Sequence, residues 1–488
     1  MDGFTITGGY SYGEFFSLTL DGMGAGMLLE GSSAFANSRP RISNCIFEHN
    51  ACYAGGGLCT TWLNPDDPGM TKHWVNPVLR NCVFNENQAF YWGGAFYVNS
   101  PSGNGDTLRI RDCAFTGNYC YSVTGGGGLC FSEITNTNVR LSTCLFERDS
   151  APSGALGGAI YFDNQQQLNA SKASLVMDSC IFRKNIAANG AGLFYGGDIL
   201  HPKSVNFYCR INQCLFEANE TNNEGGAAYS MSSAILGGNI TVLVTNCAFK
   251  DNLSKSSITS VGGYGTGMID YRVERCTFLN NSYVSNTLSP SHMAISTWAT
   301  SYFATSRKIH VRINNCIFGK NGGGVSTIDT DQSTAVTEIT NCTFFDNSRY
   351  IFYKNSLPVS PEGYHNDMYL NNCVIWEPHT DGIRLFRNGN NTLNMYEMYG
   401  FHVENTLIEV PDNFYTWPGA QEVFGSGMIL NQYPGFVDTT ANDFHLLPCS
   451  LPVNAGSNIV ADTLGLITDL DGHPRIFDGQ VDMGAYEG

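Results

Sequence analysis

The sequence predicts an all-β fold, a right-handed parallel β-helix (solenoid) of about twelve coils, with interior ladders of Cys, Phe and Asn and an irregular C-terminal cap. Three observations predict it: a recurring phrase Cys-x-Phe-x-x-Asn, a repeat length of about 33 residues, and the lack of helical periodicity. We expect the coils to occupy residues 1–410 and the cap to occupy residues 411–488.

The repeated phrase contains eleven of the 17 cysteines, spaced 26 to 40 residues apart. A Phe follows two positions after all but the last of these cysteines, and an Asn follows five positions after nine of them. Stacked coils bring equivalent residues over one another, about 4.8 Å apart, so each residue type is expected to form a ladder. The ladder cysteines are Cys45, Cys82, Cys113, Cys144, Cys180, Cys214, Cys247, Cys276, Cys316, Cys342 and Cys373.

Each repeat is expected to supply three short strands. Apolar residues precede the cysteine at three and often five positions, as Val311 and Ile313 precede Cys316, and the uneven gap predicts a bend between two strands. Asn stands directly before the cysteine in six repeats, which suits a left-handed backbone at the bend. A glycine-rich third strand follows, as in residues 56–59.

The composition argues against several classes of partner. The chain has 26 basic and 43 acidic residues, a formal charge of −17, and only 14% charged residues. Without a cluster of Lys and Arg along the sequence, we expect no binding to nucleic acid or to an anionic membrane surface. No apolar run approaches the roughly 20 residues of a membrane-spanning helix. Residues 2–9 resemble a strand and a glycine turn, so we expect an upstream part such as a signal sequence or earlier coils.

A family resemblance rests on the repeats and the tail. The combination of Phe-x-x-Asn with Gly-Gly-Ala-(Ile/Leu/Phe) resembles the repeats of polymorphic outer membrane proteins and related bacterial surface β-helix proteins, within the pectate-lyase-like superfold. The opening and the tail are similar to secreted β-helix repeat proteins with a C-terminal anchor or sorting region. The matching tail phrases are residues 434–438, 443–446, 454–456, 469–475 and 481–487. This resemblance implies a bacterial, secreted or cell-surface protein, whose signal sequence and anchor are not present in this chain.

The extracellular setting that the resemblance implies permits disulfides. In-register ladder cysteines would lie about 4.8 Å apart with parallel side chains, farther than the β-carbons of a disulfide, so we expect free buried thiols. Two local bridges remain open, Cys52–Cys59 and Cys120–Cys130. Cys52 and Cys120 each follow a ladder cysteine by seven residues, and Cys59 and Cys130 each end a Gly-Gly-Leu-Cys phrase. No zinc-type spacing occurs, and no metal site is predicted.

An insertion at residues 61–74 contains the best candidate ligand residues, Trp62, Asp66, Asp67 and Trp74. Rings that stack on sugar faces and carboxylates that accept hydroxyl hydrogen bonds would make a sugar platform. A loop held down by its own aromatic residues, with a Pro-Asp turn, explains the same residues.

Aromatic residues recur at matching offsets in the next two repeats, as Phe90-Tyr91-Trp92 and as Tyr119-Cys120-Tyr121. Stacked on one flank, they would extend an aromatic strip, in which Tyr91 and Trp92 are further ligand candidates. A ladder that packs beneath loops is the alternative.

No catalytic residue is predicted. A polygalacturonase-type enzyme needs clustered aspartates with a histidine and basic residues, and a pectate lyase needs calcium carboxylates beside an Arg or Lys base. Neither phrase is present along the chain, although residues about 33 apart become neighbours across coils. Asp469 and Asp471 resemble half of a calcium loop that Gly472-His473-Pro474 interrupts, so no cofactor is expected, with calcium as the open exception.

Three functional hypotheses follow. The first is a non-enzymatic secreted or cell-surface scaffold of adhesin type, whose loops contact carbohydrate or protein partners. The second is a polysaccharide lyase or glycoside hydrolase. The third is an extracellular filament subunit that assembles end to end as a homo-oligomer, since the end of an open β-helix exposes unpaired backbone.

Overall fold

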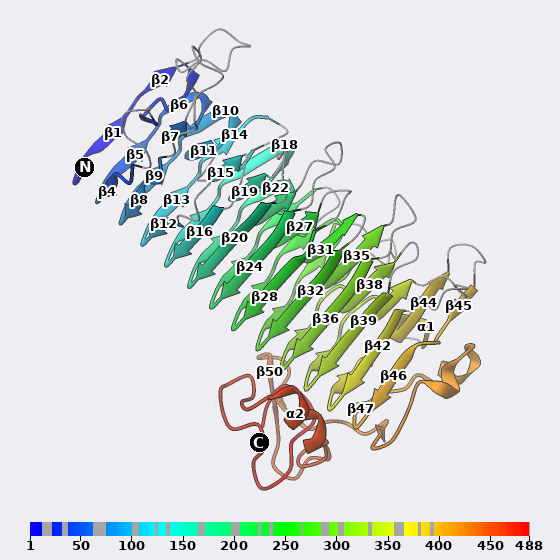
Figure 1. Cartoon of the computed structure of the whole chain (residues 1–488). Helices are drawn as coiled ribbons and strands as arrows, with labels where there is room; N and C mark the ends of the chain where they lie inside the picture. The colour runs from blue at the N-terminus through cyan, green and yellow to red at the C-terminus, as the bar shows by residue number, and fades with distance from the viewer. Residues whose placement is uncertain are drawn as a thin grey trace. The chain divides into compact units, whose positions relative to one another are not determined.

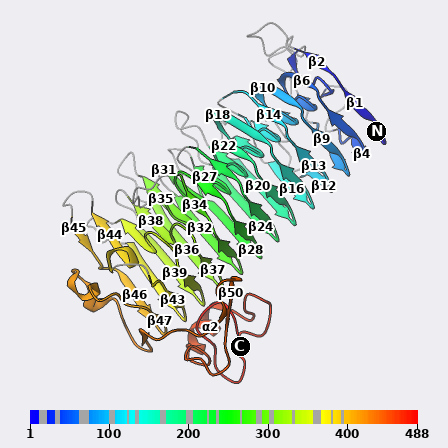
Figure 2. The ribbon, with the colours of Figure 1, turned by 180° about the vertical axis from the view of Figure 1, so that it is seen from behind.

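A computed structural model describes residues 1–11, 22–31, 38–61, 75–99, 107–122, 125–132, 137–163, 171–196, 205–222, 226–233, 238–264, 267–284, 292–300, 307–329, 334–355, 366–378, 382–390 and 395–487. The chain forms two compact units, unit 1 (residues 1–240 and 252–255) and unit 2 (residues 241–251 and 256–488). Both are parallel β-solenoids with very little helix, so the predicted fold class is confirmed (Figures 1 and 2). The number of turns differs slightly from the twelve expected.

Unit 1 stacks its strands in four sheets. Sheet A contains β4 (Arg41–Ser43), β8 (Val78–Arg80), β12 (Thr107–Arg111), β16 (Thr137–Ser142), β20 (Ser171–Asp178) and β24 (Val205–Asn212). Sheet B contains β1 (Thr5–Thr7), β5 (Ile46–Glu48), β9 (Val83–Asn85), β13 (Ala114–Thr116), β17 (Leu145–Glu147), β21 (Ile181–Arg183) and β25 (Leu215–Glu217). Sheet C contains β2 (Tyr10–Ser11), β6 (Ala51–Ala54), β10 (Gln88–Trp92), β14 (Tyr119–Cys120), β18 (Ser150–Leu156), β22 (Ile186–Asn189), β26 (Glu220–Thr221) and β30 (Leu253–Ser254). Sheet D contains β3 (Met27–Glu30), β7 (Leu58–Thr61), β11 (Phe96–Asn99), β15 (Leu129–Ser132), β19 (Ile160–Asp163), β23 (Leu193–Gly196) and β27 (Tyr229–Ser233).

Unit 2 repeats the same order. Its sheet A contains β28 (Ile240–Thr245), which begins at the unit boundary, β32 (Gly267–Glu274), β36 (Arg307–Asn314), β39 (Thr334–Thr340), β42 (Asn366–Asn371) and β46 (Phe401–Glu404). Its sheet B contains β29 (Ala248–Lys250), β33 (Thr277–Leu279), β37 (Ile317–Gly319), β40 (Thr343–Phe345), β43 (Val374–Trp376), β47 (Leu407–Ile408) and β48 (Ile429–Leu430). Its sheet D contains β31 (Thr259–Tyr264), β35 (Ile295–Thr300), β38 (Val325–Asp329), β41 (Phe352–Asn355), β44 (Phe386–Asn390) and β45 (Met395–Glu397), and β34 (Ser282–Tyr283) belongs to sheet C. The remaining elements are β49 (Phe436–Asp438), β50 (Asp443–Leu446), α1 (Gly382–Leu385), α2 (Asn458–Leu464) and the 3-10 turns η2 (Phe414–Thr416) and η3 (Ala420–Glu422).

A complete coil of unit 1 therefore has four strands, one more than the sequence predicted. The predicted glycine-rich strand corresponds to β7, and the additional strand is β6, which a left-handed Gly55 at φ 71° separates from β7. The predicted bend before the cysteine is confirmed, because the preceding residue has positive φ in all eleven repeats, from Asn44 to Asn372.

The three predicted ladders are present within each unit. Neighbouring Phe rings stack with centroids 4.5–4.9 Å apart and interplanar angles of 2–8°, as Phe47 stacks on Phe84. The ladder cysteines are buried, and the Cys82 amide donates to Cys113 Sγ at 3.4 Å. In the asparagine ladder, Asn50 Nδ2 donates to Asn87 Oδ1 at 3.0 Å.

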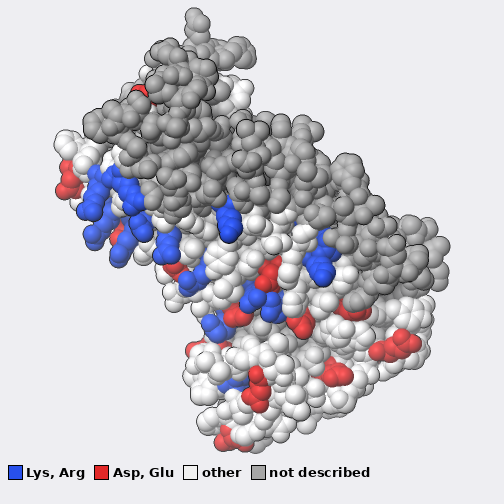
Figure 3. All heavy atoms as spheres, viewed as in Figure 1, with Lys and Arg blue, Asp and Glu red and all other residues white. Residues whose placement is uncertain are grey.

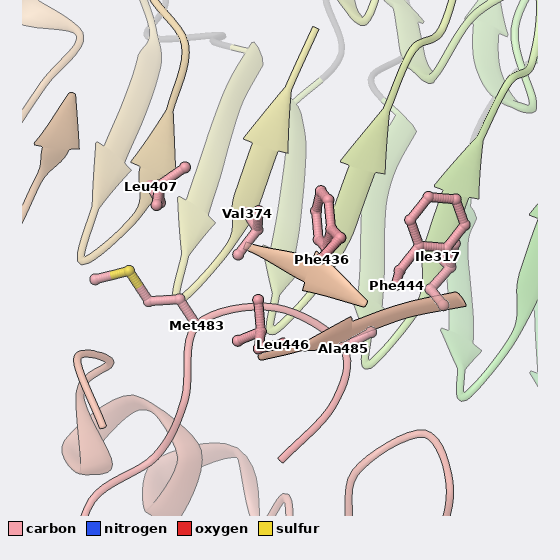
Figure 4. Packing of buried hydrophobic residues seen from close by; sticks show 8 residues of the cluster. All are labelled: Ile317, Val374, Leu407, Phe436, Phe444, Leu446, Met483 and Ala485. Carbon is pink, nitrogen blue, oxygen red and sulfur yellow. The ribbon is translucent and has the colours of Figure 1, made fainter. Parts of the chain in front are cut away.

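The tail of unit 2 packs both on the last coil and along the side of the solenoid. The η2 ring of Phe414 contacts Phe386 with centroids 6.2 Å apart. Farther on, Phe436 and Phe444 of the tail hairpin lie against Ile317 of β37 in one buried cluster (Figure 4). Lys320 Nζ donates to Thr439 O at 2.7 Å, which ties the same hairpin to the coil. In the described part of the chain, no helix has the length and apolar character needed to cross a membrane.

Candidate ligand-binding surfaces

An aromatic strip crosses sheet C of unit 1. We define it as Tyr53 on β6, Phe90 and Tyr91 on β10, and Tyr119 and Tyr121 on and just after β14. The sequence analysis placed the aromatic residues of the Cys82 and Cys113 repeats at matching offsets. The parallel register pairs Gln88 with Tyr119, which brings the ring centroids of Phe90 and Tyr121 to 6.5 Å.

A β-bulge in β10 gathers these rings. Ala89 is opposite Cys52 and Trp92 is opposite Ala54, so three steps along β10 match two steps along β6. The extra residue places both Phe90 and Tyr91 beside Tyr53, with ring centroids 6.2 Å and 4.7 Å away. Such bulges redirect side chains and are common next to functional sites.

The rings of the strip combine apolar faces with polar edges. Burial, the charge of Tyr91 and a hydrogen bond to Tyr91 raise the pKa of Tyr53, so its hydroxyl stays protonated at neutral pH. Tyr121 is 44% exposed, and its hydroxyl donates to Gln88 Oε1 at 3.2 Å. Exposed rings with fixed hydroxyls can stack on the apolar face of a sugar and bond its hydroxyl groups.

Trp92 contacts two rings of the strip, with centroids 5.4 Å from Tyr91 and 6.2 Å from Tyr53. Its ring stacks on Tyr97 at 5.5 Å and packs against a buried cluster that includes Cys59, Cys130 and Tyr161. Trp92 is half-buried, as Tyr91 is, and its role as a ligand residue stays a prediction.

The other predicted ligand residues, Trp62, Asp66, Asp67 and Trp74, lie outside the residues that the structure describes. Their role as a sugar platform stays a prediction.

The cysteines near the strip are free thiols, in place of the two local bridges considered from the sequence. Cys52 Sγ donates to Ala54 O at 3.0 Å, and Cys120 Sγ donates to Tyr91 O at 3.1 Å. Burial raises the pKa of Cys52 to about 11 and that of Cys120 to about 12, and burial also raises the pKa of Cys59. Since the thiolate is the reactive form, these groups have a structural role.

A second surface corrects the sequence analysis. Although no Lys/Arg cluster exists along the chain, basic side chains gather over β4 to β16 on sheet A of unit 1 (Figure 3). These four strands contain five arginines and no carboxylate. They are Arg41, Arg80, Arg109, Arg111 and Arg140. Sequence reasoning missed them because consecutive members of this set stand up to 39 residues apart along the chain. The signal available was an Arg at a fixed offset before a ladder cysteine, four positions for Arg41, Arg109 and Arg140 and two positions for Arg80 and Arg111.

A polar hollow of about 480 Å³ borders this basic surface. Its lining is Asp2, Ser43, Asn44, Arg80, Asn81 and Asp112. Asn44 Nδ2 donates to Asp2 Oδ1 at 2.6 Å, and Arg111 Nε lies 3.0 Å from Asp112 Oδ2. The hollow combines the two carboxylates of Asp2 and Asp112 with the guanidinium of Arg80, an arrangement that can bind a polar ligand.

The predicted half of a calcium loop lies in the tail of unit 2. The two oxygens of buried Asp469 accept hydrogen bonds from the amides of His473 and Glu487, at 2.7 and 3.0 Å. Asp471 Oδ2 lies 2.9 Å from His445 Nε2. Among the described residues, no group of three or more His, Cys, Asp or Glu side chains is placed to hold a metal ion. Calcium binding here stays a prediction.

Comparisons of the chain with models of known protein families and with curated proteins found no match.

Proposed function

We propose that this protein is a non-enzymatic, secreted or cell-surface scaffold of adhesin type, whose aromatic strip binds a glycan. The proposal includes the bacterial, polymorphic-outer-membrane-protein-like character that the repeats resemble. The observation that carries it is the bulge in β10, which turns two consecutive aromatic residues toward Tyr53 on the outside of the solenoid.

Burial alone does not account for the strip. The interior of the solenoid is filled by the Phe ladder, whose rings are fully buried, whereas Tyr121 is 44% and Tyr10, on the neighbouring β2, is 75% exposed. Tyr121 is exposed, and the other four rings of the strip are half-buried. Aromatic rings that reach the surface with hydroxyl groups are typical of surfaces that bind sugars or proteins. The low density of charge on the chain favours a neutral ligand over a charged one at this strip.

The test measures binding of neutral polysaccharides to the full chain by affinity electrophoresis and calorimetry. A Tyr91→Ala/Tyr121→Ala double variant is expected to weaken binding about 3- to 10-fold for each ring lost. Tyr208→Ala is the matched control, because Tyr208 is 40% exposed but lies on β24 of sheet A. Equal affinity of the double variant and the control would contradict the proposal, and so would a protein ligand that binds the strip while every glycan fails.

The polar hollow favours a second candidate, a polysaccharide lyase or hydrolase. Asp2, Asp112 and Arg80 line one hollow, and an acid–base mechanism on a uronic acid sugar needs such groups together. The same polysaccharides, scored for chain cleavage by the appearance of reducing ends, test this candidate. Cleavage that is lost in Arg80→Gln would establish it, and intact polymer after prolonged incubation would eliminate it for the polymers used.

A further inference from the structure

Three arginines of unit 1 form a straight row across the stacked coils. The in-register pairs are Arg41 with Val78, Val78 with Arg109, and Arg109 with Arg140. Strands of a sheet lie about 4.8 Å apart, so the row extends about 15 Å in a direction perpendicular to the strands. We call Arg41, Arg109 and Arg140 the arginine row.

The arginine row is exposed and its charges are not neutralised. Each of the three residues is exposed, and within the part of the chain that the structure describes none of their guanidinium groups forms an ion pair. The adjacent Arg80 and Arg111 differ, because both lie within 4.0 Å of Asp112. Three unpaired cations therefore stand in line on a chain with a net charge of −17.

In unit 2, arginines at the same position of the repeat form ion pairs with a carboxylate. Arg272 and Arg312 also stand four positions before a ladder cysteine, and both donate to Asp270, at 2.8 and 2.7 Å. Asp270 precedes Arg272 by two positions on the same strand, and Arg272 pairs with Arg312 on the next strand. In unit 1 the residue equivalent to Asp270 is Thr107, beside Arg109 and Arg140. The neutral threonine leaves the row without a counter-ion.

We propose that the arginine row is a binding site for a linear anionic polysaccharide, which lies across the coils and pairs a sulfate ester or a carboxylate with successive guanidinium groups. A guanidinium offers a planar fork of donors that matches such oxyanions. A single line of cations fits a chain-like ligand, and the Asn, Ser and Thr residues beside the row supply partners for sugar hydroxyls. This surface is separate from the aromatic strip and does not depend on the function proposed for it.

Nucleic acid is the competing polyanion. Proteins that hold single-stranded nucleic acid use aromatic side chains as stacking platforms, and β4, β8, β12 and β16 contain no aromatic residue. A duplex presents phosphates over a broad surface, and the acidic remainder of the chain would repel it. A polysaccharide is therefore the occupant that the row fits best.

The experiment measures binding of dextran sulfate, polygalacturonate, neutral dextran and a single-stranded oligonucleotide to the full chain over a range of salt concentrations. We expect dextran sulfate or polygalacturonate to bind and dextran to fail, and which of the two binds more tightly identifies the anionic group. Arg109→Gln/Arg140→Gln should lower affinity at least tenfold and reduce the slope of log affinity against log salt by about 2.

Two further variants make the test specific. Thr107→Asp should abolish binding as well, because it recreates in unit 1 the carboxylate that neutralises Arg272 and Arg312 in unit 2. Arg183→Gln/Arg210→Gln removes the same charge from two arginines that are already paired, with Glu147 and Asp178, and should bind like the wild type. Equal losses in the control and row variants would overturn the proposal, as would tighter binding of the oligonucleotide than of either polysaccharide. Failure here leaves the aromatic-strip test with neutral glycans unaffected.

Discussion

The side chain of Asn118 donates from Nδ2 to Asp149 Oδ1 at 2.8 Å. Asp149 occupies a position of the ladder at which the neighbouring coils on both sides have asparagine. The Asn118 amide donates to the same oxygen at 2.9 Å, whereas Asp149 Oδ2 is buried without a partner. In other rungs the equivalent side-chain atom is an Nδ2 that donates to the carbonyl of a Phe in the preceding coil, as Asn185 Nδ2 donates to Phe146 O. Asp149 can fill this role only as the neutral acid.

Asp149→Asn is expected to stabilise unit 1 at neutral pH. Burial raises the pKa of Asp149 to about 8, above the value of about 4 in an unfolded chain. The folded state then binds the proton more tightly, so the free energy of unfolding falls as pH rises from about 4 to about 8. The variant lacks this fall and should gain on the order of 1–3 kcal/mol at pH 7. Denaturant unfolding of the wild type and the variant at pH 5 and pH 8 measures how the free energy of unfolding of each changes with pH.

The control adds an acid to the same ladder. Asn185→Asp should introduce a second pH-dependent loss of stability in the same range, since Asn185 is equally buried and donates to Asn219 at 2.9 Å. Identical pH slopes in the wild type and Asp149→Asn would show that the carboxyl is not protonated in the folded state.

The number of cysteines that react with a thiol reagent tests whether all the thiols are free. Sixteen of the 17 cysteines are buried and Cys449 is exposed, and all are free. A thiol reagent should therefore modify one cysteine rapidly in the native protein and 17 after denaturation without reductant. A denatured count of 15 or 13 would instead indicate one or both of the bridges Cys52–Cys59 and Cys120–Cys130. A Cys449→Ser variant, with no rapid reaction, is the control.

His445 joins the tail hairpin to the following turn in a pH-dependent way. Its Nδ1 lies 2.6 Å from Asp443 Oδ1 and its Nε2 lies 2.9 Å from Asp471 Oδ2. Partial burial lowers the pKa of His445, but the hydrogen bonds to the two carboxylates outweigh it and raise the pKa. The stabilisation is therefore present below the unfolded value of about 6.5 and is lost as pH rises through the raised value.

Asp471→Asn should lower the pKa of His445, which proton NMR titration measures directly. Asp462→Asn removes an exposed carboxylate from α2 and should leave the titration unchanged. A His445 titration that is the same in both variants would show that Asp471 does not contact the ring in solution.

Apolar packing joins the tail to the coils of unit 2. Phe444 is 1% exposed and contacts Phe345 and Phe436, with ring centroids 5.3 and 5.6 Å away. Phe444→Ala should lower the free energy that holds the tail against the coils by about 3–5 kcal/mol. Limited proteolysis should then cut within residues 431–488 at lower protease concentration. Phe477→Ala, at a residue 55% exposed, should match the wild type. Equal cleavage of the two variants would show that the cluster does not hold the tail.

Features that recur in every repeat could be predicted from the sequence. The ladders and the left-handed bends were predicted because each residue type stands at a fixed offset from a cysteine, and stacking repeats one local environment many times. The alignment of Phe90 with Tyr121 followed from the same offsets, whereas Tyr53, eight residues after its ladder cysteine, was not singled out.

Features that occur once could not be predicted. The bulge in β10 depends on one extra residue in a strand, which no offset reveals. The arginine row depends on Arg41, Arg109 and Arg140 and on the lack of a carboxylate at Thr107, a difference that emerges only when strands are placed side by side. The tail contains no repeat, so no sequence pattern indicated that Phe444 packs against the coils.

The asparagine ladder has a direction. Asn50, Asn87 and Asn118 each donate toward the following coil, so their amide dipoles align and add along the stack like the peptide units of a helix. Such a series of side-chain hydrogen bonds ends at a side chain that accepts from the preceding coil and does not itself donate to the following coil. Asp149 finishes the first run, and Glu377 receives Asn347 Nδ2 at 2.7 Å in unit 2. The two acids thus stand at the electropositive end of an aligned row of amides, where a carboxyl oxygen is favoured and a lysine or arginine in the same place would oppose the whole row.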